Sequence, residues 1–124
     1  MFALGVLHLV LTFRGSSFAP RDAALVDLLK KAHPNITLQT SLWRAYVGFN
    51  ASHSLGAILF GAVYGYLAAV NSDFLFGSWF LGTIGLVCLL SYTALARLYW
   101  FHLPFLSIAV SAIFFGAGLM CAWA

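Results

Sequence analysis

Residues 45–70 read AYVGFNASHSLGAILFGAVYGYLAAV, a run without a single charged side chain. A helix that crosses the hydrocarbon core of a bilayer needs about 20 consecutive, mostly apolar residues, and this run exceeds that length. It therefore predicts a membrane-spanning helix over about residues 43–70, with Ser41 as its N-cap. Two further uncharged stretches predict spans over about residues 74–96 and 98–123.

A fourth apolar run covers residues 1–14 and is shorter than the other three. At ~1.5 Å per residue it makes a helix of only about 20 Å. Such a helix must extend past Arg14, lie in a thinned bilayer, or continue residues that precede the chain. We count it as the first span. The predicted fold is all-α, with residues 1–124 forming a single transmembrane domain, a four-transmembrane-helix bundle.

The amino-acid composition also indicates a membrane protein. Apolar residues make up 63% of the 124-residue chain and charged residues only 7%. A soluble domain is about half apolar and about a quarter charged. So few charges could not cover a globule of this size, which excludes an ordinary soluble domain, a disordered chain and a nucleic-acid-binding protein. The lipid bilayer is therefore the first expected partner.

Residues 20–32, between the first two spans, predict a short amphipathic helix that lies on the membrane surface. Pro20 suits the first helical position, and Asp22 in the first turn complements the helix dipole. The apolar residues follow the spacing i, i+3, i+4 and i+7: Leu25, Leu28, Leu29 and Ala32. Lys30 and Lys31 close the helix, where positive charge suits the dipole.

The charged residues predict an orientation. The six basic residues fall in the loop at 14–44 and at position 97: Arg14, Arg21, Lys30, Lys31, Arg44 and Arg97. With four spans, both positions lie on one side of the membrane. The positive-inside rule then places that side in the cytoplasm and both termini outside. Arg44 and Arg97 are expected to reach lipid head groups, or one of them to bind the anionic head group of a substrate.

The span at 43–70 carries one polar face. On a helical wheel with ~100° per residue, this face holds Asn50 and His53 together with small residues, while bulky apolar residues lie opposite. Small residues let helices approach closely, so this face and its counterpart in the last span should point into the bundle. The expected packing residues are Ala57, Gly61, Gly65, Ala112 and Gly116.

Three histidines lie at similar depth in the membrane: His8, His53 and His102. Each is roughly 8–14 Å along its helix from a basic residue at the boundary. Ionisable groups inside a membrane are costly and are candidates for function. In one interpretation each imidazole is hydrogen-bonded to a neighbour such as Asn50 and fixes packing. In the other, the three converge with Asn50 on a quinone, a haem, a metal ion or another lipid-soluble ligand.

Two segments, GVLHL at residues 5–9 and LWRAYVGFNASHSLG at residues 42–56, resemble motifs of an uncharacterised group of small bacterial four-helix membrane proteins. The resemblance implies a four-helix protein of the bacterial inner membrane. It assigns no cofactor and no catalytic residue.

Two functions are compatible with these observations. The first expectation is a non-catalytic accessory subunit that packs against other transmembrane helices, in a hetero-complex or a homo-oligomer of a respiratory, photosynthetic or transport system. No carboxylate lies inside a span, which favours this role over a proton-coupled antiporter. The alternative is a stand-alone binding protein or enzyme with a ligand site formed by His8, Asn50, His53 and His102.

Overall fold

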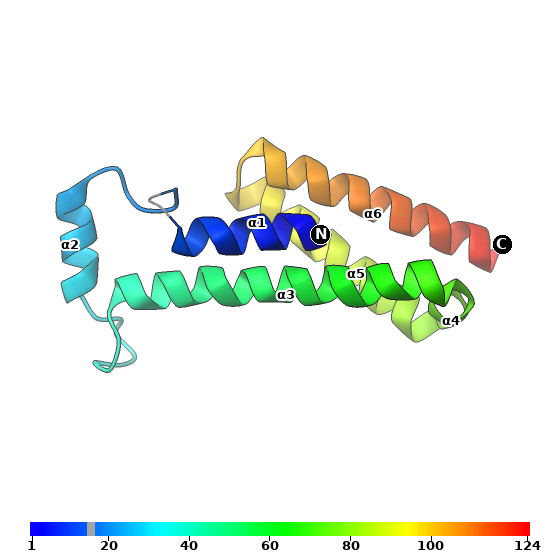
Figure 1. The fold of residues 1–124 in the computed structure, drawn as a ribbon, viewed down its shortest axis with the longest axis horizontal. Helices are drawn as coiled ribbons and strands as arrows, with labels where there is room; N and C mark the ends of the chain where they lie inside the picture. Colours follow the sequence, from blue (N-terminus) through cyan, green and yellow to red (C-terminus); the bar gives the residue numbers. More distant parts are fainter. Residues whose placement is uncertain (15–16) are drawn as a thin grey trace.

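The computed structural model describes residues 1–14 and 17–124, and this part of the chain is all-helical, with 81% of it in helices. The helices follow one another as α1 (Phe2–Phe13), α2 (Ala23–Lys31), α3 (Leu42–Val70), α4 (Ser72–Gly77), α5 (Trp79–Tyr99) and α6 (His102–Trp123). The all-α prediction is confirmed. α2 lies across one end of α1 and α3, roughly perpendicular to both (Figure 1).

Three of the described helices, α3, α5 and α6, are long and apolar enough to cross a membrane, whereas four were expected. The difference lies in α1, which has 12 residues. At ~1.5 Å per residue it reaches about 18 Å, against about 30 Å for the hydrocarbon core. The backbone of Arg14 is extended, with φ −109° and ψ 97°, so α1 ends before it could lengthen.

Two helix boundaries differ from the sequence prediction. The stretch expected to begin at residue 74 is divided: α4 ends at Gly77, and α5 begins only after Ser78, whose side chain accepts a hydrogen bond from the N–H of Leu81. The last span was expected from residue 98, but Leu98 and Tyr99 belong to α5. Extended backbone at Trp100, with φ −118° and ψ 179°, separates α5 from α6. In contrast, α3 begins and ends within one residue of its prediction.

The amphipathic helix is shorter than predicted. α2 begins at Ala23, because the Asp22 side chain caps it and accepts a hydrogen bond of 2.9 Å from the N–H of Ala24. Pro20 therefore precedes the helix. Lys30 and Lys31 form its last turn, as expected. Leu25 and Leu28 are exposed on the outside of the molecule.

The helices pack as two pairs, α1 with α3 and α5 with α6, joined at one end by α4 (Figure 1). α1 runs antiparallel to α3 and covers only part of its length. Glycines allow the close approach within the first pair. A Cβ atom added to Gly5 would lie 2.9 Å from the backbone nitrogen of Ile58, and one added to Gly61 would lie 2.7 Å from the Cα of Phe2.

The other expected packing residues have mixed surroundings. Ala57 and Ala112 are buried. A Cβ atom at Gly116 would meet only Leu86, at 3.9 Å, and one at Gly65 would have open space around it. Gly65 is exposed, and an added Cβ atom there would touch no other helix of the described chain.

The second pair packs on two glycines that the helical wheel did not single out. Cβ atoms at Gly82 and Gly85 of α5 would lie 2.7 Å from side-chain atoms of Leu119 and Phe115, respectively. Tyr64 of α3 also reaches this face, and its hydroxyl donates a hydrogen bond of 3.0 Å to the carbonyl oxygen of Leu81. This bond links the two helix pairs.

The two ends of the bundle differ in charge. The described basic residues all lie at the end that holds α2 and the connection from α5 to α6: Arg14, Arg21, Lys30, Lys31, Arg44 and Arg97. The opposite end holds α4, with Asp73, and the C-terminus (Figure 1).

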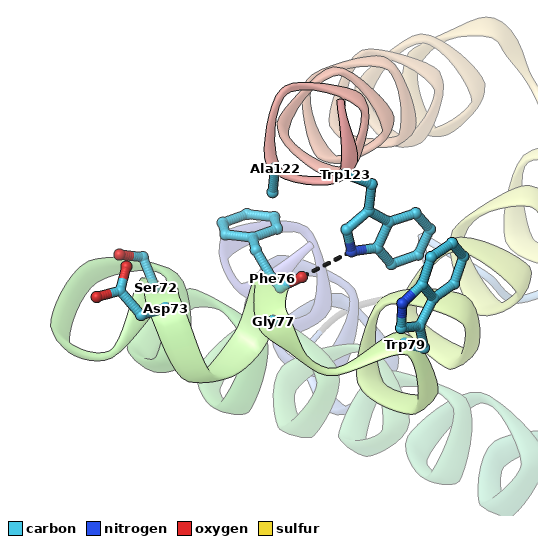
Figure 2. Close-up of a pocket in the computed structure, with 7 residues that line it drawn as sticks. All are labelled: Ser72, Asp73, Phe76, Gly77, Trp79, Ala122 and Trp123. Carbon is cyan, nitrogen blue, oxygen red and sulfur yellow. Dashed lines mark hydrogen bonds between the residues drawn. The ribbon is translucent and has the colours of Figure 1, made fainter.

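A stacked pair of tryptophans connects the helices at the end of the bundle opposite α2. Trp123 of α6 stacks on Trp79 with ring centroids 4.0 Å apart, and its indole N–H donates to the carbonyl oxygen of Phe76 at 2.7 Å (Figure 2). These contacts fasten α6 to α4 and to the start of α5.

Candidate functional site

Two of the three histidines expected inside the membrane come together in the structure. His8 of α1 and His53 of α3 lie edge to face, with ring centroids 5.5 Å apart. Asn50, one helical turn before His53, lies beside His8. His102 is not part of this group: it is exposed at the start of α6 and lies beside another cavity.

Asn50 holds the imidazole of His8 in one orientation. Its side-chain Nδ2 donates a hydrogen bond of 2.9 Å to the carbonyl oxygen of Tyr46, so its Oδ1 is the atom that faces His8. The Nε2 of His8 lies 3.1 Å from this oxygen and must donate to it, because an amide oxygen only accepts. A neutral His8 therefore keeps Nδ1 as a hydrogen-bond acceptor.

Trp100 forms an aromatic wall against both imidazoles. Its ring is nearly parallel to that of His8, at 5.6 Å between centroids and 11° between planes. It meets the ring of His53 edge to face at 4.7 Å. Extended backbone at Trp100, between α5 and α6, is the local feature that places the indole there.

Two more aromatic residues complete the surroundings. The ring of Phe18 packs on His8 at 4.5 Å, and the ring of Tyr92 lies 5.4 Å from His53. Phe18 is fixed by Tyr46, whose hydroxyl donates a hydrogen bond of 2.8 Å to its carbonyl oxygen. The site thus combines residues from α1, α3, α5 and the segment that follows α1.

Besides a small space of about 30 Å³, His53 and Trp100 line two larger cavities at this place. One has a volume of about 560 Å³ and is lined by His8, Phe18, Tyr46, Phe49, Asn50, His53, Tyr99, Trp100 and Phe101. The other, of about 270 Å³, is lined by Phe49, His53, Tyr92, Leu95, Ala96, Tyr99 and Trp100. Both combine aromatic walls with few polar atoms, the usual composition of a small-molecule site.

The ring nitrogens of His53 differ from those of His8 in their hydrogen bonding. Among residues 1–14 and 17–124, no protein group is hydrogen-bonded to the imidazole of His53. His53 is an internal residue of α3, far from both helix ends. His8 and His53 could each supply one nitrogen ligand to a metal ion. The same residues contain no group of three or more His, Cys, Asp or Glu side chains placed to bind a metal ion.

A cavity of about 610 Å³ lies at the other end of the bundle, beside the tryptophan pair. Figure 2 shows that the carboxylate of Asp73 points away from the two indoles of Trp79 and Trp123. The polar and aromatic groups of this cavity therefore do not converge on one ligand position, in contrast to those around His53.

Sequence patterns found part of the site. The helical wheel placed Asn50 and His53 on one face, and depth in the membrane added His8. Nothing in the local sequence indicates that Trp100 reaches His53, since that contact depends on how the two helix pairs meet. Comparison of the chain with protein-family models, with curated proteins and with solved structures finds no match.

Proposed function

We propose that this chain is an integral membrane protein that binds a lipid-soluble ring compound of the quinone class between His8, His53 and Trp100. The observation that carries the proposal is the unpartnered imidazole of His53, which lines both cavities beside an indole. The ring is half-buried at the edge of both cavities, and a ligand oxygen there would accept from its N–H, a hydrogen bond that no described protein group makes.

The chemistry of the residues fits this ligand class. An imidazole N–H of His53 can donate to a quinone carbonyl, and the free Nδ1 of His8 can accept from the hydroxyl of the reduced form. A flat ring can stack on the indole of Trp100, since offset stacking between aromatic rings is favourable. A ligand dissolved in the bilayer reaches such a site without crossing water.

The test is a binding titration with a short-chain benzoquinone on the purified protein in mild detergent. Quinones quench indole fluorescence on contact, so binding beside Trp100 should lower the emission in a saturable way. His53→Phe keeps an aromatic ring and removes both nitrogens. We expect it to raise the Kd about tenfold, which corresponds to one hydrogen bond of ~1.4 kcal/mol.

His102→Gln is the matched control, because it removes an imidazole that lies beside a different cavity. This variant should retain the wild-type Kd. Absence of saturable quenching in the wild-type protein, or an equal Kd in the His53→Phe variant, would refute the proposal.

We also propose that α1 inserts in the membrane beside α3 and counts as a fourth, short transmembrane helix. The close glycine contacts between these helices support this arrangement. The end that holds the six basic residues would then face the cytoplasm, with both termini outside. The resemblance of residues 5–9 and 42–56 supports a bacterial inner membrane as the location.

A role as an accessory subunit is the second candidate. It is supported by the part of α3 that follows Gly61, which α1 does not cover and where Gly65, Tyr66 and Val70 are exposed. A transmembrane helix of another subunit could approach closely at Gly65. Co-purification of a membrane partner that Gly65→Leu abolishes would support this function, and purification of the wild-type protein without one would count against it.

A further inference from the structure

A separate cavity lies at the connection between α5 and α6. It has a volume of about 240 Å³ and is lined by Ala96, Arg97, Trp100, Phe101, His102 and Phe105. It shares Trp100 and Phe101 with the larger site, but it contains neither His8 nor His53. Its polar groups are a guanidinium and an imidazole, so its ligand should differ in charge from a quinone.

The charge of Arg97 is not compensated by the protein. In the part of the chain that the structure describes, the one ion pair joins Lys30 to Asp27, at 3.6 Å within α2. Asp73 lies at the opposite end of the bundle. The guanidinium of Arg97 instead lies against an aromatic face, with its Cζ 5.9 Å from the ring centroid of Phe105. This contact leaves its N–H donors free for an anion.

The neighbours of Arg97 favour a phosphate group as that anion. A guanidinium presents paired N–H donors in a plane, which matches two oxygens of a phosphate. His102 adds an imidazole donor on the same cavity. Arg97 lies in the last turn of α5, at the end of the bundle that holds the basic residues, and it precedes Tyr99 and Trp100 by two and three residues in the sequence. Tyrosine and tryptophan mark the level of the lipid head groups in membrane proteins.

We infer that Arg97 and His102 form a binding site for a phosphate group, carried either by an anionic phospholipid or by a free phosphate ion. Trp100, Phe101 and Phe105 supply apolar walls for the atoms next to the phosphate. This site is additional to the proposed quinone site and does not depend on it.

Native mass spectrometry of the purified protein tests the inference. The protein is mixed with equal amounts of phosphatidylglycerol and phosphatidylcholine, and the ratio of the two bound lipids is measured. We expect the wild-type protein to retain phosphatidylglycerol preferentially. Arg97→Gln should reduce that preference about tenfold, and His102→Gln should reduce it by a smaller factor, since one imidazole N–H makes a single hydrogen bond where the guanidinium makes a paired one.

Arg21→Gln is the matched control, because it removes one exposed positive charge from the same end of the molecule without touching this cavity. It should keep the wild-type preference for phosphatidylglycerol. An unchanged far-UV circular dichroism spectrum and an unchanged thermal unfolding midpoint of the Arg97→Gln variant would show that its fold is intact, whether or not the protein binds a quinone.

A second measurement distinguishes the source of the phosphate. Isothermal titration of inorganic phosphate into the wild-type protein should give heat only if the cavity binds the free ion, and this heat should be absent in Arg97→Gln. Lipid preference that depends on Arg97 assigns the site to a phospholipid, and a phosphate titration that depends on Arg97 assigns it to the free ion. Equal lipid ratios in the wild-type, Arg97→Gln and Arg21→Gln proteins, together with no phosphate heat, would overturn the inference.

Discussion

Gly61 and Gly65 lie one helical turn apart on α3, yet their surroundings are opposite. A Cβ atom at Gly61 would lie 2.7 Å from the Cα of Phe2, whereas one at Gly65 would meet nothing within 4 Å. The atom opposite Gly61 belongs to the backbone of α1, which cannot rotate away as a flexible side chain would. The first glycine is therefore required for helix packing within this chain, and the second is not.

Alanine should destabilise the fold at Gly61 but not at Gly65. Gly61→Ala should lower the free energy of unfolding by about 1–3 kcal/mol, the usual cost of an overpacked contact. Gly65→Ala should leave it unchanged or raise it by up to ~1 kcal/mol, because alanine is the better helix former. Unfolding by SDS in mixed micelles, followed by circular dichroism, measures both. Equal destabilisation by the two substitutions would contradict the packing of α1 on α3.

Single residues also show how far sequence reasoning reaches into the candidate site. Asn50 and His53 share a face because they are three residues apart, and this follows from helix geometry alone. Depth along the helix gave the same prediction for His8 and His102, but only His8 lies beside Asn50 and His53. His102 lies elsewhere because extended backbone at Trp100 starts α6 in a new direction, so its first residue is exposed. Depth along a helix does not determine the direction of a side chain.

At the scale of helices, the predictions were good where a helix is long and apolar, and poorer at its ends. Hydropathy located α3, α5 and α6, because each must exceed about 20 residues to cross a bilayer. It could not place the breaks after Gly77 and at Trp100, since both fall inside apolar sequence. The first break is marked by one capping side chain, that of Ser78, and the second by extended backbone at Trp100 with no side-chain cap on α6.

The hydrogen bond from Tyr64 to the carbonyl oxygen of Leu81 joins the two helix pairs, and its removal should loosen them. Tyr64→Phe keeps the ring that packs near Gly85 and deletes only the hydroxyl. We expect it to lower the free energy of unfolding by about 0.5–1.5 kcal/mol, the net value of one hydrogen bond. Thermal unfolding in detergent measures the loss.

Tyr66→Phe is the control for this experiment, because Tyr66 is 63% exposed and does not lie between the two helix pairs. Its unfolding free energy should stay within about 0.5 kcal/mol of the wild-type value. A loss of equal size in both variants would show that the bond to Leu81 does not hold the pairs together.

At the scale of the whole molecule, the separation of charge between the two ends predicts the orientation in the membrane. The basic end should face the cytoplasm, so the C-terminus at the opposite end should face outward. A reporter that is active only outside the cytoplasm, fused after Ala124, should be active in bacterial cells. A reporter that is active only in the cytoplasm, fused at the same position, should be silent. The reverse pattern would refute the orientation.

The contact between Trp79 and Trp123 gives the molecule an optical property of its own. Two indoles whose centroids lie 4.0 Å apart can couple their electronic transitions, so we expect a paired positive and negative band in the circular dichroism spectrum. Trp43 and Trp100 have no indole partner of this kind among the described aromatic contacts. The paired band therefore reports specifically whether the C-terminal turn of α6 remains docked, without any added label.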